Sequence, residues 1–137
     1  MSQMHAVVWV DAWQMECCGE AFAVGDDVTW QLDDDPDRDW LEAALGPQVA
    51  ARVTHAEEHH PDGEDLPQVT GRVVAIARSW CDYRPDSDDG RLLLPVPGSA
   101  VLSAVDRYDG GIERAARPGL TFNGWVVDLQ LDGVDRA

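Results

Sequence analysis

The sequence predicts an α+β fold, in which a small antiparallel β-barrel or rolled sheet of five to six strands carries one helical insertion. Strand-like segments recur along the chain, and helical spacing of apolar residues follows the second of them. No repeating strand, helix, strand order is present, which argues against a parallel sheet. A chain of 137 residues can bury a core without metal or disulfide cross-links, so we expect one domain over residues 1–137.

The first two strands are predicted on either side of a glycine turn. Residues 7–10 (VVWV) are β-branched and aromatic, too few to span a membrane and too apolar for a solvated loop, which indicates a strand buried on both faces. Gly25 and Asp26 can supply the positive φ of a tight turn. Beyond this turn, apolar and polar side chains alternate over residues 28–32, as in a half-buried strand.

A helical insertion is predicted after the second strand. The acidic run 33–37 (DDDPD) ends the strand and can supply a helix N-cap, and apolar residues then recur at helical spacing as far as Leu45. Gly46 and Pro47 end this helix and can start another. The second helix is predicted over residues 48 to about 60, because three apolar residues fall on one helical face, namely Val49, Val53 and Ala56.

The longest predicted strand covers residues 69–80. Val74, Ile76 and Trp80 are expected on one face of it, and Gly71 is expected to mark a β-bulge or a close approach of another segment. Acidic loops that contain glycine and proline precede and follow this strand.

Three further segments complete the predicted fold. Residues 91–96 (RLLLPV) form a strand, and Pro95 places it at a sheet edge or at a strand end. Residues 99–107 fit either a strand or a helix, whereas residues 108–118 fit a loop. Residues 125–131 alternate and indicate the last strand.

The charge balance argues against several classes of partner. The chain has 26 acidic and 10 basic residues, a formal charge of -16 and a pI near 4.2, and every basic residue is an arginine. Such a field repels phosphate backbones and anionic lipids, so we expect no direct binding to nucleic acid or to a membrane surface. The simplest interpretation of the acidity is the composition of a GC-rich or salt-adapted genome.

The cysteines and the N-terminus indicate a cytoplasmic protein. No charged and then apolar leader opens the chain, and no apolar run approaches the length of a bilayer crossing. The chain has three cysteines, two of them adjacent, which is not the even and spaced framework of a secreted disulfide domain. We therefore expect free thiols in a reducing compartment.

A zinc site is one hypothesis for the cysteines. Zinc requires four nitrogen or sulfur ligands, and adjacent cysteines fit that geometry poorly. One of the pair could still join Cys81 and two histidines that lie one helical turn apart; the candidate ligands are Cys17, Cys18, Cys81, His55 and His59. The alternative is that one cysteine is a small core residue and the other lies in a turn, while the histidines end a solvated helix.

A cysteine nucleophile is a weaker hypothesis for the same residues. Thiol catalysis requires a lowered thiol pKa, which a nearby cation or a helix N-terminus provides. Glu16 and Glu20 place the opposite charge beside Cys17 and Cys18. We therefore predict no catalytic residue.

The aromatic residues suggest where a ligand could bind, because the chain has six tryptophans in a short sequence. Those on apolar strand faces are expected in the core, namely Trp9, Trp30 and Trp125. Those at predicted strand ends beside the cysteines are the candidate ligand-binding residues of an exposed site, namely Trp13, Trp80 and Tyr83.

The opening of the chain resembles a known family. Its pattern is V-D-x-W-Q-x-x-C-C-G-x-x-F-x-V-G-D-x-V-x-W, and it is matched by Val10, Asp11, Trp13, Gln14, Cys17, Cys18, Gly19, Phe22, Val24, Gly25, Asp26, Val28 and Trp30. The pattern is similar to that of an uncharacterised actinobacterial family, a domain of unknown function. The resemblance implies a source and no activity.

These observations favour a small, acidic, cytosolic binding module that takes a protein or small-molecule ligand and has neither catalytic activity nor a cofactor. The first alternative is the metal or thiol site described above, with zinc as its metal. The second alternative is an acidic mimic of nucleic acid, in which the acidic segments 33–39, 57–65 and 82–89 share one face. Solvated loops are the simpler interpretation of those segments.

Overall fold

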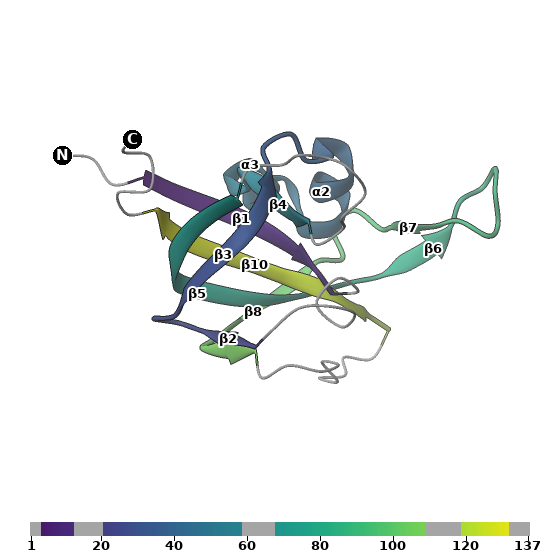
Figure 1. Cartoon of the computed structure of the whole chain (residues 1–137). Coiled ribbons are helices and arrows are strands. Elements are labelled where there is room, and N and C mark those ends of the chain that lie inside the picture. Colours follow the sequence, from purple (N-terminus) through teal and green to yellow (C-terminus); the bar gives the residue numbers. More distant parts are fainter. Residues whose placement is uncertain (1–3, 13–20, 59–67, 109–118, 132–137) are drawn as a thin grey trace.

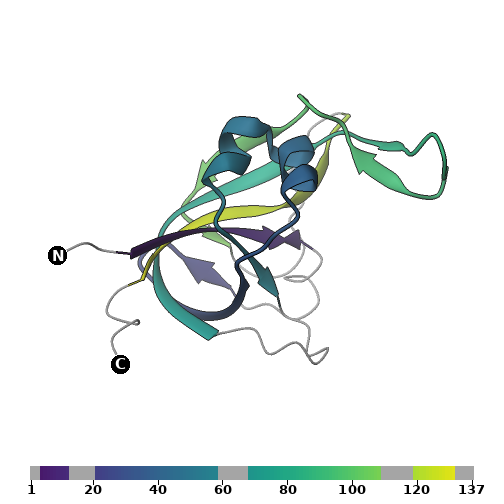
Figure 2. The same ribbon diagram turned by 90° about the horizontal axis from the view of Figure 1, so that it is seen from above.

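The computed structural model describes residues 4–12, 21–58, 68–108 and 119–131. Within them, five strands close into a barrel, two short helices cover one side of it, and a two-stranded ribbon extends away from it (Figure 1, Figure 2). The predicted α+β class with a small barrel is therefore confirmed.

The elements follow in the order β1 (Met4–Asp11), β2 (Phe22–Ala23), β3 (Asp27–Asp33), α2 (Arg38–Leu45), α3 (Pro47–Arg52), β4 (His55–Glu58), β5 (Gln68–Cys81), β6 (Tyr83–Pro85), β7 (Leu93–Pro95), β8 (Val101–Val105), β9 (Arg107–Tyr108) and β10 (Thr121–Leu131).

The barrel closes because β10 pairs with both β1 and β5. The strand order β10-β1-β4-β3-β5 thus returns to β10, while β8 pairs with β5 next to the ring. All pairs of the ring are antiparallel except β1 and β4, which are parallel with Val8 opposite His55. A closed ring of five strands cannot alternate in direction throughout, so one pair of this mainly antiparallel barrel must be parallel.

Strand β1 is buried on both faces, as its apolar run predicts. Val8 and Val10 point into the barrel and belong to its core. Trp9 and Val7 point to the opposite side and pack in a second apolar cluster, which the helices cover. β1 therefore joins the two cores of the protein.

Aromatic rings form a continuous chain through the barrel. Trp30 meets Phe22 edge-on with ring centroids 5.3 Å apart, and Phe22 meets Tyr108 at 5.7 Å. The short β2 and β9 strands, which pair with each other, hold these last two rings. The chain continues with centroid separations of 4.6, 5.0 and 5.6 Å through Trp125, Phe122 and Trp80.

The long strand β5 confirms the prediction for residues 69–80 but changes face halfway. Asp128 lies opposite Ala75 and Leu129 lies opposite Val73, so Val74 is an extra residue in the pairing. A bulge of this kind reverses the alternation, and Val73 and Ile76 are therefore buried while Val74 is exposed. The expectation that Val74 shares a face with Ile76 is wrong for this reason.

Gly71 lies where another segment approaches closely, which is one of its two predicted roles. A Cβ atom there would lie 2.9 Å from Leu131 Cδ2 and 3.2 Å from Leu129 Cβ. The absence of a side chain at Gly71 allows the end of β10 to lie close to the beginning of β5.

The predicted helix boundaries are confirmed at residues 37 and 46. The Asp37 carboxylate accepts a hydrogen bond from the Trp40 amide at 3.1 Å and caps α2. Gly46 has φ 88° and ends α2, and Pro47 begins α3. The Arg38 guanidinium donates to the carbonyls of Ala50 and Val53 and ties the two helices together.

The second helix is shorter than predicted. α3 ends at Arg52, and the backbone of Val53 is extended. His55 and Ala56 lie on β4, which pairs with β1 and β3. Strand pairing with two neighbours outweighs the helical spacing of the apolar residues, so the predicted helix is wrong over residues 53–58. Residues 59 and 60 of that predicted helix lie outside the described part of the chain.

The remaining segments are strands. Residues 101–105, which fit either a strand or a helix, form β8 and pair with β5. β7 lies at an edge, as Pro95 predicts, and pairs with β6 in a separate two-stranded sheet. The final strand is confirmed as β10.

Replacing Trp30 should destabilise the fold strongly. Its side chain is 8 % exposed and begins the aromatic chain. We expect Trp30→Ala to lower the free energy of unfolding by about 3–5 kcal/mol, with a melting temperature lower by roughly 10 °C or more. Thermal unfolding followed by circular dichroism measures the change, and Val24→Ala, at a side chain 45 % exposed, is the control. A nearly neutral Trp30→Ala would contradict this packing.

Gly124 should tolerate no side chain. Its φ is 153°, and a Cβ atom there would lie 2.2 Å from the Val10 carbonyl oxygen and 2.8 Å from Trp9 Cη2. We expect Gly124→Ala to cost about 2–4 kcal/mol of stability. Gly90→Ala, where a Cβ atom meets nothing within 4 Å, should change stability by less than about 0.5 kcal/mol in the same urea titration. Equal effects of the two substitutions would refute the close contact.

Candidate ligand-binding site

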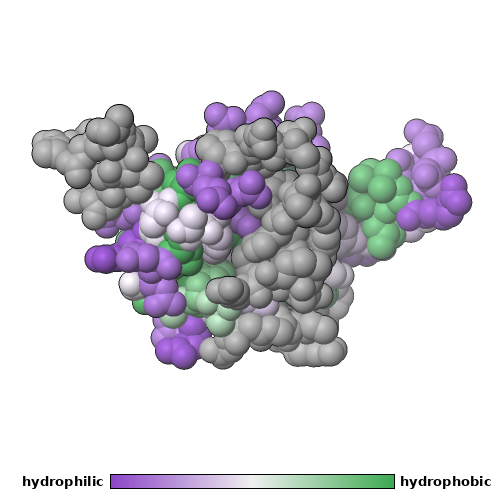
Figure 3. All heavy atoms as spheres, viewed as in Figure 1, coloured by the Kyte–Doolittle hydropathy of each residue, from purple (hydrophilic) through white to green (hydrophobic). Residues whose placement is uncertain are grey.

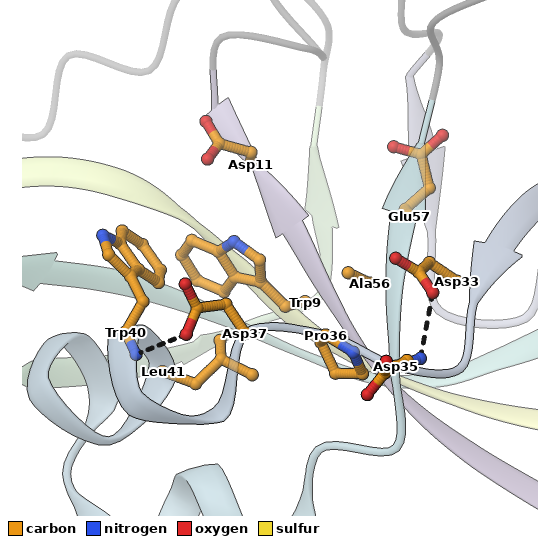
Figure 4. Close-up of a pocket in the computed structure, with 10 residues that line it drawn as sticks. All are labelled: Trp9, Asp11, Asp33, Asp35, Pro36, Asp37, Trp40, Leu41, Ala56 and Glu57. Atoms are coloured by element: carbon orange, nitrogen blue, oxygen red, sulfur yellow. Dashed lines mark hydrogen bonds between the residues drawn. The ribbon is translucent and has the colours of Figure 1, made fainter. Parts of the chain in front are cut away.

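A pocket of about 460 Å³ opens where the barrel meets the helices. It lies at the ends of β1 and β3, beside β4 and the beginning of α2 (Figure 4). Its walls combine aromatic and acidic side chains, and the lining residues are Trp9, Asp11, Asp33, Asp35, Pro36, Asp37, Trp40, Leu41, Ala56 and Glu57. We call it the Trp9–Trp40 pocket.

Two indole rings form the aromatic side of the pocket. The Trp9 and Trp40 ring centroids are 5.6 Å apart, and the ring planes are tilted by 53°. Trp9 is 5 % exposed and is fixed by its place on β1, whereas Trp40 is half-buried on the first turn of α2. Both rings therefore have restricted positions before any ligand arrives.

Backbone hydrogen bonds hold the aspartates of the segment between β3 and α2. The Asp35 amide donates to Asp33 Oδ1 at 2.9 Å, and the Trp40 amide donates to Asp37 Oδ1 at 3.1 Å. These short-range turns and caps are typical of aspartate. They fix the direction in which the Asp33 and Asp37 carboxylates point.

Two further carboxylates come from the barrel. Glu57 lies on β4 opposite Leu32 and is only 2 % exposed, and Asp11 lies at the end of β1. Figure 4 shows Asp37 beside the indoles, Asp33 and Asp35 on the other side, and Asp11 and Glu57 further along the wall. The carboxylates surround a volume instead of converging on one point.

This arrangement favours a positively charged ligand with an apolar surface. The face of an indole ring attracts a cation, and a partly desolvated carboxylate attracts it more strongly than the same carboxylate does in water. A pocket of this volume can enclose an ammonium or guanidinium group that carries carbon substituents.

A second cavity, of about 390 Å³, lies between the barrel end and the ribbon. We call it the ribbon groove, and its lining residues are Asp11, Ala12, Tyr83, Leu93, Thr121, Phe122 and Asn123. Asp11 is common to both cavities, so both lie next to the end of β1.

A buried polar cluster forms one wall of the groove. Asn123 is an extra residue between the β10 residues paired to β5, and its side chain is 6 % exposed. The Asn123 amide donates to Tyr83 Oη at 3.2 Å and to Cys81 Sγ at 3.4 Å. These hydrogen bonds connect the barrel to the first residue of the ribbon.

Burial controls the ionisation of this cluster. Desolvation raises the pKa of the Cys81 thiol above its ordinary value, and the Asp82 charge raises it further, while hydrogen bonds from Tyr83 and Asn123 oppose the shift. Desolvation likewise raises the pKa of Tyr83. Both groups are therefore neutral at physiological pH.

The sequence model of a family of unknown function, DUF6578, matches residues 4–131. The chain belongs to this DUF6578 family. No curated protein and no solved structure gives a significant match to the chain. Membership of an uncharacterised domain family is thus confirmed, whereas the actinobacterial source and the motif of the opening residues stay predictions.

Several predicted site residues of this DUF6578 chain lie outside the described part of the structure, namely Trp13, Cys17, Cys18 and His59. The zinc hypothesis therefore stays a prediction, but one of its premises is wrong. His55 lies on strand β4 and its Nδ1 is 2.7 Å from Thr54 Oγ1, so it cannot form a helical pair with His59. Within residues 4–12, 21–58, 68–108 and 119–131, no three His, Cys, Asp or Glu side chains are arranged to hold a metal ion.

The aromatic candidates are separated by the fold. Trp80 is 1 % exposed and packs on Phe122 inside the barrel, so the expectation of an exposed Trp80 is wrong. Tyr83 is half-buried and lines the ribbon groove. The expectation of a core Trp30 and Trp125 is confirmed, and a ligand role for Trp80 and Tyr83 stays a prediction.

The Trp9–Trp40 pocket was missed from the sequence. Trp9 lies in the core, as predicted, and also lines the pocket, whereas the acidic segment 33–39 is predicted as a solvated loop. A usable signal existed, because the run 33–37 both ends a strand and caps a helix and therefore lies at a junction of elements.

In the described residues, no helix is long and apolar enough to cross a membrane.

Cys81 should be unreactive in the folded protein, since it is fully buried and its thiol pKa is raised. In a Cys17→Ser/Cys18→Ser variant, Cys81 is the remaining thiol. At pH 8 we expect it to react with an aromatic disulfide reagent at least about a hundredfold more slowly in the native than in the urea-unfolded protein. Rapid labelling of Cys81 in the native protein would show an accessible thiolate and would support a cysteine nucleophile.

Proposed function

We propose that this DUF6578 protein is a small, acidic binding module of the cytoplasm without catalytic activity, and that it binds an organic cation in the Trp9–Trp40 pocket. The observation that carries the proposal is the pairing of two fixed indoles with carboxylates from β1, the β3–α2 segment and β4 around one cavity. An ammonium or guanidinium group with a carbon substituent matches both kinds of wall.

The charge of the whole chain supports the same ligand class. A formal charge of -16 attracts cations from solution and raises their concentration near the surface. The pocket adds selectivity, because a hydrated metal cation or a neutral apolar molecule satisfies only one of its two kinds of wall. Selectivity for an organic cation follows from this combination.

The pocket also bears on the alternatives. Asp33, Asp35 and Asp37 turn around a cavity, which favours cation binding over the display of charge that mimicry of nucleic acid requires. Burial of Cys81 favours a structural role for this thiol over a nucleophilic one. Zinc binding by Cys17 or Cys18 with Cys81 and a histidine remains the alternative proposal, and elemental analysis decides it independently.

Isothermal titration with choline as the probe tests the proposal. We expect saturable binding to the wild type, with 3,3-dimethyl-1-butanol, the neutral molecule of the same shape, binding at least about fivefold more weakly. Trp40→Ala should weaken choline binding by about fivefold or more, since it removes one indole face. Asp37→Asn should weaken it by about two- to fivefold, because the amide keeps the N-cap acceptor but removes the charge.

Asp39→Asn is the matched control for Asp37→Asn. Asp39 lies on the same first turn of α2 and is exposed, but it does not line the pocket. It should leave the affinity for choline within about twofold of the wild type, measured at the same ionic strength. If Asp37→Asn and Asp39→Asn lower the affinity for choline equally, the loss reflects general charge attraction and not the pocket. If the neutral analogue binds as tightly as choline, the proposal is wrong.

A further inference from the structure

The β6–β7 ribbon is an ordered extension of the protein. Figures 1 and 2 both show it reaching away from the barrel. At its tip the Asp86 amide donates to the Leu92 carbonyl at 2.7 Å, and the Leu92 amide donates to the Asp89 carbonyl at 3.0 Å. Further amide bonds to the carboxylates of Asp86 and Asp89 stabilise the turn. Whatever side chains the ribbon carries are therefore presented on a defined backbone.

The ribbon carries an exposed apolar patch. Leu92, Leu93 and Leu94 are 49 %, 56 % and 42 % exposed, and Figure 3 shows hydrophobic atoms gathered on this projecting part beside hydrophilic ones. A leucine side chain gains free energy when it leaves water for an apolar contact. Three consecutive leucines exposed to water are thus a marked departure from the acidic surface around them.

The pairing of the ribbon separates these leucines onto two faces. Leu93 lies opposite Pro85, whereas Leu94 lies opposite Arg84, and directly opposed residues share a face. Leu93 also lines the ribbon groove together with Tyr83 and Phe122. The Leu93 face is therefore continuous with a cavity, and the Leu94 face is not among its walls.

Charge identifies the kind of partner that fits this surface. Residues 82–91 contain four aspartates and two arginines, and Asp11 adds a carboxylate to the wall of the groove. Arg84 pairs with Asp82 at 2.9 Å and Arg91 with Asp89 at 3.6 Å, so the net negative charge of the ribbon comes from Asp86 and Asp88. A second copy of the chain, with its own charge of -16, is repelled from such a surface.

We propose that the ribbon groove docks an extended segment of another protein, one that alternates apolar and basic side chains. The apolar side chains pack on Leu93 and Phe122 in the groove, and the basic ones are attracted by Asp11 in its wall and by Asp86 and Asp88 on the neighbouring ribbon tip. This surface is distinct from the Trp9–Trp40 pocket, with which it shares Asp11 alone. The ribbon groove is proposed to bind a macromolecular partner, whereas the Trp9–Trp40 pocket is proposed to bind a small cation.

A synthetic ten-residue peptide that alternates leucine and arginine is the probe, titrated by fluorescence anisotropy. We expect it to bind the wild type at least about tenfold more tightly than a serine and arginine peptide of equal charge. Leu93→Ser should weaken binding by about tenfold. Leu94→Ser is the matched control, since it makes the same change at a similarly exposed leucine on the opposite face, and it should alter the affinity by less than about twofold.

Three outcomes would overturn the proposal. Equal binding of the two peptides would mean charge attraction without a groove, and equal effects of Leu93→Ser and Leu94→Ser would mean that the patch binds without regard to face. Self-association of the wild type in sedimentation velocity, lost in Leu93→Ser, would make a second copy the occupant. Trp40→Ala should bind the peptide normally, so failure of the cation pocket and failure of the groove are distinguishable.

Discussion

The contact of the Trp9 indole with the backbone of Gly124 is the constraint on which the two layers of this protein depend. A Cβ atom at Gly124 would overlap the Val10 carbonyl and the Trp9 ring, so only glycine lets β1 and β10 pair with the indole lying between them and the helices. Trp9 then contacts Trp40 of α2 and lines the pocket. One close packing interaction thereby positions the barrel wall, the helical layer and the aromatic side of the candidate site.

The same stretch of β10 also determines where the ribbon begins. The irregular pairing that precedes Gly124 leaves Asn123 as an extra residue, and its amide reaches inward to Cys81 and Tyr83. Because Tyr83 is the first residue of β6, this buried amide fixes the root of the ribbon against the barrel. The ribbon groove and the Trp9–Trp40 pocket are therefore two consequences of adjacent positions on one strand.

Most elements of the fold could be predicted because their signals are local. The β-branched run of β1, the alternation in β3 and β10, the Asp37 cap and the Gly46 terminus each act within a few residues. The bulge at Val74 and the strand β4 could not be predicted, since pairing with β10, β1 and β3 decides them. The pocket was missed for the same reason, because Trp9 and the run 33–37 are distant in sequence and meet only when the barrel closes.

The acidity of the chain acquires a more specific meaning in the structure. Composition alone suggests a solvated and functionally neutral surface, and for many exposed aspartates that interpretation holds. In the segment between β3 and α2, however, Asp33 accepts a backbone bond in a turn and Asp37 caps the helix, so local folding already fixes two carboxylates at the pocket wall. Their mutual repulsion is offset during folding by these bonds and by the helix dipole, before any ligand is present. A cation that enters the pocket therefore relieves repulsion between groups that are already ordered, and most of its attraction appears as affinity because little further ordering is required.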